Sequence, residues 1–335
     1  MSHADTLVSS KLSIVAPCYN EAAGLPEFVR RLQATCAQLA CPCEILLVND
    51  GSRDETLAVA IDIATRVPEV RVINLLRNFG HQAAVTAGLD IADGDAVILI
   101  DSDLQDPPEL IIEMVAEWRK GADVAYGKRR SRQGETAFKL FTAKIFYRLL
   151  RGLTKSPIPA DTGDFRLMDR RVVEALRSMR ERHRFIRGMV SWVGGKQVAV
   201  EYDRKPRFAG ETNYPFRKML AFAVDAITSF SVVPLRLVTY LALTIILLAI
   251  GATALVFVVK LVNPNFFIPG YASIMLTIIF FGGLQLLALG IIGEYLGRMY
   301  ESVKVCPIYI VEQIYQHQAG RLTGRDPNQA PPGAF

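Results

Sequence analysis

The sequence predicts an α/β fold, a mostly parallel sheet with flanking helices, followed by a hairpin of two apolar helices. Between residues 12 and 121, short runs of Val, Ile and Leu alternate with segments whose apolar residues recur at helical spacing, as in a parallel sheet with crossover helices. Farther along, residues 237–259 and 272–292 contain no charged side chain, and each is close to the ~20 residues that a helix needs to cross a bilayer. Two buried helices of a soluble protein would be the alternative, but two such runs this close together favour a transmembrane hairpin.

The elements of the predicted sheet follow one another in a regular order. Each strand is a continuous apolar run, which predicts that helices cover both faces of the sheet. Asn20 is placed to cap the first helix, and this helix carries Leu25, Phe28, Val29 and Leu32 at helical spacing. The predicted strands are 12–17, 43–50, 70–76 and 96–101, and the helices that follow the last three are 56–66, 81–92 and 108–121.

The 335 residues are enough for one large domain or two smaller ones, and we expect four parts. These are an α/β domain (1–212), a juxtamembrane interfacial helix (213–234), the transmembrane hairpin (235–293) and a tail (294–335).

Two segments of the first part and one of the tail depart from the sheet pattern. The chain from Gly127 is basic and turn-like, and residues 137–153 then mix aromatic, aliphatic and basic residues. That mixture suits a helix lying on a membrane surface or one packed on the α/β domain, and both interpretations stay open. The segment from Gln318 onward is rich in Gly, Pro and Gln and is predicted to be disordered.

Charge predicts the orientation in the membrane. Basic residues flank the two spans on one side only, whereas the connecting loop contains a single lysine, Lys260. The positive-inside rule therefore places the α/β domain and the tail in the cytoplasm of a multi-pass inner-membrane protein. The flanking basic residues are Arg217, Lys218, Arg236, Arg298 and Lys304.

The cysteines and the net charge limit the functional classes. The five cysteines include only a C-x-C pair, Cys41 and Cys43, so neither a disulfide framework nor a zinc site is expected, and no cleavable signal peptide is visible. The formal net charge of +5 suits contact with anionic lipid headgroups rather than nucleic acid, because the membrane is already present.

Polar residues follow three of the predicted strands. They are the segments Pro17–Glu21, Asn49–Ser52 and Asp101–Asp103. Ligands of open α/β sheets bind beyond the carboxyl ends of the strands, so these segments should meet at one edge. Asp101, Asp103 and the side-chain carbonyl of Gln105 offer only oxygen ligands, which suit Mg²⁺ or Mn²⁺ bound together with phosphate oxygens. Aspartates at strand ends also form turns and helix caps, so a structural role is the alternative.

In this order, these segments resemble the family-two GT-A glycosyltransferases, and within them the polyprenyl-phosphate glycosyltransferases such as bactoprenol glucosyltransferases and dolichol-phosphate mannose synthases. The resemblance runs over nearly the whole chain and ends in the two-span hairpin. The matching segments are Pro17–Glu21, Asn49–Ser52, Arg77–His81, Asp101–Pro108, Asp161–Met168 and Gly293–Arg298.

The resemblance implies roles for individual residues. Pro17, Tyr19, Glu21 and Asp50 would hold the nucleotide base and ribose. Asp101, Asp103 and Gln105 would lie at the diphosphate and its metal ion, with Asp103 and Gln105 preferred as direct ligands.

The remaining implied roles concern phosphate binding and catalysis. Arg129 and Arg166 occupy positions of phosphate-binding arginines, although Arg129 would otherwise be a solvated loop charge. Asp164 would act as general base or would orient Arg166, and His81 is a weaker candidate with a structural alternative. Asn213 stands where relatives often have a lysine, so no charged contact is expected there.

The implied activity is transfer of a hexose, with inversion, from a nucleotide sugar to polyprenyl (undecaprenyl) phosphate at the cytoplasmic membrane face. UDP-glucose is the preferred donor and GDP-mannose the alternative. A processive polysaccharide synthase is a second alternative, but it would carry a Q-x-x-R-W signature that is absent here. A membrane-anchored binding or flippase subunit is the non-enzyme alternative, and it predicts loss of the acidic strand ends. Glycines in the second span could bring helices of a homo-oligomer together.

Overall fold

The computed structural model describes residues 10–39, 41–129, 162–181, 184–203, 233–263, 270–304, 306–318 and 321–325. These residues fall into two compact units: an α/β unit, which includes the described residues after 305, and a helical unit (residues 233–304). The predicted amphipathic helix 137–153, most of the predicted interfacial helix 213–234 and Asn213 lie outside the described residues.

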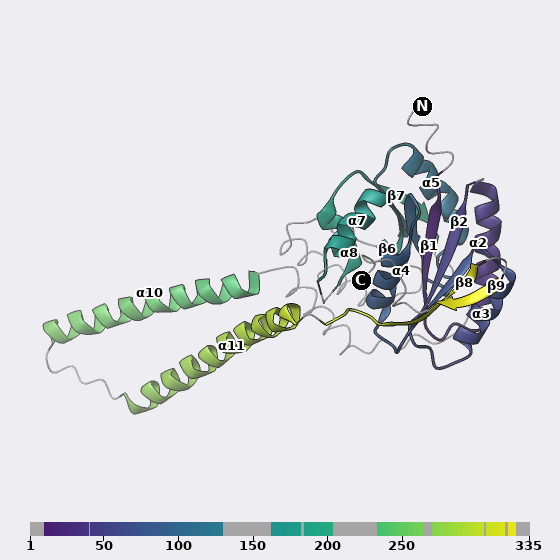
Figure 1. Ribbon diagram of the computed structural model, residues 1–335. Helices are drawn as coiled ribbons and strands as arrows, with labels where there is room; N and C mark the ends of the chain where they lie inside the picture. Colours follow the sequence, from purple (N-terminus) through teal and green to yellow (C-terminus); the bar gives the residue numbers. More distant parts are fainter. Residues whose placement is uncertain are drawn as a thin grey trace. The chain divides into compact units, whose positions relative to one another are not determined.

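The α/β unit is built around one sheet, which has nine strands in the described part of the chain (Figure 1). Their order is β7-β5-β6-β4-β1-β2-β3-β8-β9. The central strands β4, β1, β2 and β3 are mutually parallel, and antiparallel strands join them on both sides. The strands are β1 (Leu12–Cys18), β2 (Cys43–Asn49), β3 (Val70–Leu75), β4 (Ala96–Leu99), β5 (Val124–Arg129), β6 (Thr162–Asp169), β7 (Gln197–Tyr202), β8 (Val311–Gln318) and β9 (Arg321–Arg325).

Helices cover both faces of this sheet, as the continuous apolar strands predict. Alternate residues of β1 point to opposite faces, so Ile14 packs in one hydrophobic core and Val15 in the other. The first core also receives α2 (Leu25–Leu39), α3 (Thr56–Arg66) and α5 (Ile111–Arg119), and the second receives α4 (His81–Ile91), α7 (Arg170–Ser178) and α8 (Ile186–Val193).

Helix α4 lies very close to the sheet because its inner face carries small residues. A Cβ atom at Gly88 would collide with the side chain of Val15, and Ala84 and Ala87 are fully buried. Any larger residue at position 88 would push the helix away. This close packing places His81, the first residue of α4, at the carboxyl edge of the sheet.

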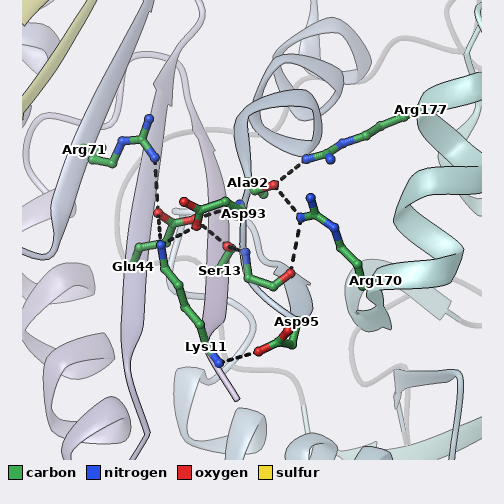
Figure 2. Close-up of polar contacts among 10 residues, drawn as sticks. Lys11, Ser13, Glu44, Arg71, Ala92, Asp93, Asp95, Arg170 and Arg177 are labelled. Carbon is green, nitrogen blue, oxygen red and sulfur yellow. Dashed lines mark hydrogen bonds and ion pairs between the residues drawn. The ribbon is translucent and has the colours of Figure 1, made fainter. Parts of the chain in front are cut away.

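A network of charges closes the opposite, amino-terminal edge of the sheet (Figure 2). Its centre is Glu44 of β2, which is 6% exposed. Its carboxylate accepts hydrogen bonds from Ser13 Oγ, from Lys11 Nζ at 3.1 Å and from Arg71 Nη1 at 3.2 Å. Because a buried charge is tolerated only when it is paired, we assign this network a structural role. Nearby, the Arg170 side chain donates to the carbonyl of Ala92 at 2.9 Å.

The structure corrects two predictions about the sheet. The chain from Gly127 to Arg129 is not a turn, because β5 continues through Arg129 in parallel register with β7. The prediction of disorder from Gln318 onward is wrong for the described residues, since Gln318 ends β8 and residues 321–325 form β9, which pairs with β8. In both cases strand pairing outweighs the local polar composition.

The helical unit contains α10 (Val233–Val262) and α11 (Tyr271–Val303), which include both predicted spans. Within the described residues, one stretch, Phe280–Gly297, is long and apolar enough to cross a membrane, and none of it is buried inside the protein. Among the described residues, nothing lies within 4 Å of a Cβ atom built at Gly282 or Gly290, so these glycines do not serve close packing there. Whether they join subunits stays a prediction.

Candidate active site

The loops after β1 and β2 are hydrogen-bonded to each other at the carboxyl edge of the sheet. Cys18 and Asn49 are partners in the β1–β2 register, so both loops begin at the same level. The backbone N–H of Asn20 donates to Ser52 Oγ at 3.1 Å, and Arg53 N–H donates to Asn20 Oδ1 at 2.9 Å. Asn20 has a φ of 56°, a left-handed conformation that asparagine tolerates better than most residues. The predicted nucleotide-binding segments therefore form one connected surface.

Asp50 holds the loop that leads into α4. It is 3% exposed, and its carboxylate accepts hydrogen bonds from the backbone N–H groups of Phe79 at 2.7 Å and Gly80 at 3.0 Å. Desolvation raises the pKa of Asp50, although these hydrogen bonds oppose the shift. The next residue, Gly51, has a φ of 60°, and a Cβ atom there would lie 2.9 Å from Arg77 Cα. The loops after β2 and β3 are thus interlocked, and Asp50 has a clear structural role.

The acidic segment after β4 forms a constrained turn. Ser102 Oγ donates to the carbonyl of Pro17 at 2.9 Å, and Asp103 Oδ1 accepts from the backbone N–H of Gln105 at 3.1 Å. Leu104 is 5% exposed and has a φ of 60°, which is unfavourable for a leucine. The Tyr202 hydroxyl donates to Asp106 and fixes the far end of the turn. Such strain is common where the surrounding structure holds functional side chains in place.

Four ionisable side chains meet beside this turn. His81 Nε2 lies 3.7 Å from Asp101 Oδ1 and 3.3 Å from Asp164 Oδ2. Arg187 of α8 donates two hydrogen bonds to the Asp164 carboxylate, from Nε at 2.7 Å and from Nη2 at 3.0 Å. We call Asp101, His81, Asp164 and Arg187 the charged cluster.

The members of the charged cluster shift one another's pKa values. Desolvation raises the pKa of Asp101 to about 6, although His81 opposes the shift. Burial alone would also raise the pKa of Asp164, but His81 and Arg187 outweigh it and hold that pKa well below its usual range. Burial would lower the pKa of His81, yet the hydrogen bond to Asp164 and the charge of Asp101 raise it.

Arg166 of β6 is buried beside Asp164. It is 4% exposed, and its guanidinium donates to the backbone carbonyls of Asp164 at 3.2 Å and Gly163 at 3.0 Å. Burial lowers its pKa to about 10, so it remains protonated at neutral pH. Arg129 ends β5 opposite Tyr202 in the β5–β7 register. Phosphate contacts by these two arginines stay predictions.

The structure thus brings most of the predicted site residues to one edge of the sheet. Pro17 is buried and Tyr19 is 39% exposed. Arg187 was not predicted. No sequence pattern links Arg187 to Asp164, which lies 23 positions away in the chain. The predicted residues near the edge are Pro17, Tyr19, Glu21, Asp50, His81, Asp101, Asp103, Gln105, Asp164 and Arg166.

The acidic turn suits a divalent cation that is shared with a ligand. Asp101 Oδ1 is buried and has no hydrogen-bond partner in the described part of the protein, because the His81 nitrogen is too distant. No three acidic, histidine or cysteine side chains among the described residues are placed to hold a metal by themselves. An oxygen-ligand ion such as Mg²⁺ or Mn²⁺ commonly takes one or two carboxylates and completes its shell with phosphate oxygens and water. Asp101 and Asp103, with Gln105, fit that requirement.

Comparison with known proteins identifies the family of the chain. The family model Glycosyl transferase family 2 matches residues 13–177. An uncharacterized glycosyltransferase of Synechocystis sp. is 50% identical over 305 residues, covering 91% of this chain and 96% of its own length. A prophage bactoprenol glucosyl transferase homolog of Escherichia coli is 40% identical over 304 residues, covering 91% of this chain and 99% of its own length.

Among solved structures, mannosyl-3-phosphoglycerate synthase from Rubrobacter xylanophilus is similar with a TM-score of 0.47 and 17% identity, covering 67% of this chain and 74% of its own. The sequence relatives extend over nearly their whole length, so the agreement is not confined to one motif. The chain belongs to glycosyl transferase family 2, and it is a glycosyltransferase.

Proposed function

We propose that the protein transfers a hexose from a nucleotide sugar, UDP-glucose, to polyprenyl phosphate, with inversion at the anomeric carbon. The observation that carries this proposal is the meeting of the acidic turn, the hydrogen-bonded loops after β1 and β2, and the charged cluster at one edge of the sheet. Relatives that are 39–40% identical over at least 90% of this chain are named bactoprenol glucosyl transferases, which supports a lipid-linked acceptor and glucose as the sugar.

The donor would bind across the carboxyl edge. Tyr19 and Glu21 lie in the β1–α2 loop, beside Ser52, and would contact the base and ribose. Asp101, Asp103 and Gln105 would face the diphosphate through Mg²⁺ or Mn²⁺, which when bound neutralises the charge of the leaving nucleotide. The turn that holds these side chains is fixed by Ser102 and Tyr202 before any ligand arrives, so little reorganisation is needed on binding.

The acceptor needs positioning more than deprotonation. A phosphate monoester has a second pKa of about 6 and is therefore largely ionised at neutral pH. Asp164, whose pKa lies well below its usual range, is a weak base. We therefore assign Asp164 an orienting role: it holds Arg187 and His81, two groups that can attract an anionic acceptor. Displacement by the acceptor phosphate from the face opposite the leaving group would convert an α-linked donor into a β-linked product.

The hairpin would place this chemistry at the membrane. Both helices expose large apolar side chains, including Leu247 at 69% and Leu286 at 71%, and exposed apolar area of this extent indicates contact with lipid or another protein. Lipid is the better fit, because the acceptor carries a polyprenyl chain. With the orientation that the flanking charges favour, the α/β unit and the C-terminus are cytoplasmic in a multi-pass inner-membrane protein.

A transfer assay with the full chain in detergent tests the proposal. Purified protein is incubated with polyprenyl phosphate, Mg²⁺ or Mn²⁺ and a panel of labelled sugar nucleotides that includes UDP-glucose and GDP-mannose. We expect labelled lipid-linked glucose, and we expect Asp103→Ala to remove turnover while Glu113→Ala, which changes an exposed carboxylate on α5, leaves it unchanged. A polymeric product, transfer from GDP-mannose alone, or wild-type turnover in Asp103→Ala would contradict the proposal.

A further inference from the structure

Three polar side chains link the C-terminal tail to the loop after β2. Asn49 ends β2, and Asn74 lies beside it in the β2–β3 register. Asn49 Nδ2 donates to Asn74 Oδ1 at 2.7 Å, and Asn74 Nδ2 donates to Glu312 Oε2 of β8, also at 2.7 Å. The two asparagines are 3% and 5% exposed. The side chains of Asn49, Asn74 and Glu312 form the tail relay.

The carboxylate at the end of the tail relay sets the direction of the whole chain of hydrogen bonds. An ionised carboxylate only accepts hydrogen bonds, so Asn74 must turn its amide nitrogen toward Glu312 and its oxygen toward Asn49. Asn49 must then turn its nitrogen toward Asn74, which leaves its oxygen to accept from the backbone N–H of Ser52 at 3.4 Å. A side chain at position 312 that could also donate would not impose this order.

An irregularity in strand pairing places Glu312 where it can make this contact. In the β3–β8 pair, Asn74 lies opposite Gln313, whereas the next residue, Leu75, lies opposite Val311. Glu312 is therefore the extra residue of a bulge, a feature that redirects side chains and often lies near active sites. Beyond it, Leu76 N–H donates to the carbonyl of Ile310 at 3.0 Å, so the pairing resumes.

The tail relay ends at the loop that we assign to the donor nucleotide. Ser52 Oγ accepts from the backbone N–H of Asn20, and Asp50 holds the N–H groups of Phe79 and Gly80. We infer that Glu312 is a positioning residue: by fixing the amide orientations of Asn74 and Asn49, it keeps the β2–α3 loop in the conformation that binds the donor. The expected effect on binding of the sugar nucleotide rests on the proposed function. The strand that carries Glu312 is the first strand after α11 in the chain, so the segment after the helical hairpin would complete the donor site.

Hydrogen exchange on the ligand-free full chain tests the structural half of the inference without any donor. We expect amides of residues 49–56 to exchange about 5- to 10-fold faster in Glu312→Ala, as the loss of one hydrogen bond predicts. Glu312→Gln, which can accept from Asn74 but can also donate, should give exchange rates between those of Glu312→Ala and wild type. Gln316→Ala, in the same strand but outside the tail relay, should match wild type. Unchanged exchange in Glu312→Ala would overturn the inference.

A charge exchange tests the pairing and its consequence for donor binding. Asn74→Asp puts a second carboxylate against Glu312, while Asn74→Asp with Glu312→Gln restores a donor–acceptor pair and keeps the oxygen that faces Asn49. We expect the KM for the sugar nucleotide to rise about 10-fold in Asn74→Asp and in Glu312→Ala, while kcat stays within about twofold of wild type. In the double variant, KM should return toward the wild-type value. An unchanged KM in both single variants, or no recovery in the double variant, would overturn the positioning role. If wild type transfers no hexose from any donor, the proposed function fails, and the exchange experiment still decides whether the tail relay orders the loop.

Discussion

Replacing Arg187 by alanine tests how far the charged cluster depends on one ion pair. Asp164 is 6% exposed and receives two hydrogen bonds from Arg187. Removing one partner of a buried ion pair typically costs about 3–5 kcal/mol, because the remaining charge is left without compensation. Asp164 keeps its contact with His81, and Arg187 is itself 31% exposed, so water can reach part of the vacated space. We therefore expect a loss of about 2–3 kcal/mol in the free energy of unfolding.

In Arg187→Ala, the rate of hexose transfer should fall by more than the loss of stability accounts for. Without Arg187, the Asp164 carboxylate loses the contact that fixes it, and the His81 ring, which lies against Asp164, can shift with it. A misplacement of about 1 Å can lower a rate about 100-fold. The assays are urea unfolding followed by tryptophan fluorescence and hexose transfer at saturating metal. Arg187→Lys, which keeps the charge but not the two-pronged geometry, should give intermediate values.

Arg30→Ala is the matched control. Arg30 also donates two hydrogen bonds to a carboxylate, that of Glu27 at 2.7 Å each, but its side chain is 67% exposed. Exposed pairs contribute little to stability, so neither assay should change measurably. If Arg187→Ala behaved like Arg30→Ala in both assays, the reasoning about the charged cluster would be refuted.

Three further outcomes follow from the described contacts. Glu44→Ala should lower the free energy of unfolding by about 3–5 kcal/mol in urea titrations and leave KM unchanged, because it breaks the buried network at the opposite edge of the sheet. Glu174 is exposed, so Glu174→Ala should stay within about 0.5 kcal/mol of wild type, and equal stability of the two variants would contradict the role of Glu44. Gly51→Ala should destabilise the protein and raise KM more than Gly121→Ala does. Both glycines have a positive φ, but of the two only Gly51 has other atoms within 4 Å of an added Cβ. Equal shifts in melting temperature would contradict the interlocking of the loops after β2 and β3. Chelation by EDTA should abolish transfer, and added Mg²⁺ or Mn²⁺ should restore it; full activity in EDTA would remove the metal from the account.

The sequence was a reliable guide to the parallel half of the sheet. Strands β1 to β4 and the helices between them lie close to the predicted ranges, because each strand is a buried run with its own turn residues. The family was also identified correctly from its motifs, as the match to Glycosyl transferase family 2 and the relatives confirm. The antiparallel additions were not predicted. Strands β8 and β9 are polar and lie beyond the helical hairpin in the chain, so only the pairing of β8 with β3, and of β9 with β8, defines them.

The candidate site shows the same division between local and long-range information. Aspartates at strand ends could be placed at one edge from topology alone. The sequence could not show that Asp50 would hold backbone N–H groups, that Arg166 would be buried against carbonyls, or that Arg187 would pair with Asp164. Those contacts depend on how β6 and α8 pack beside β4 and α4, which no local pattern records.

Binding of UDP to the full chain, measured by calorimetry with and without Mn²⁺, tests the central claim most directly. The claim is that Asp101 and Asp103 bind the nucleotide diphosphate through a divalent cation at the carboxyl edge of the sheet. We predict that UDP binds with Mn²⁺ present, that EDTA weakens binding at least about 10-fold, and that Asp101→Asn and Asp103→Asn remove this metal dependence. Equal affinity with and without Mn²⁺, or unchanged metal dependence in both variants, would contradict the account.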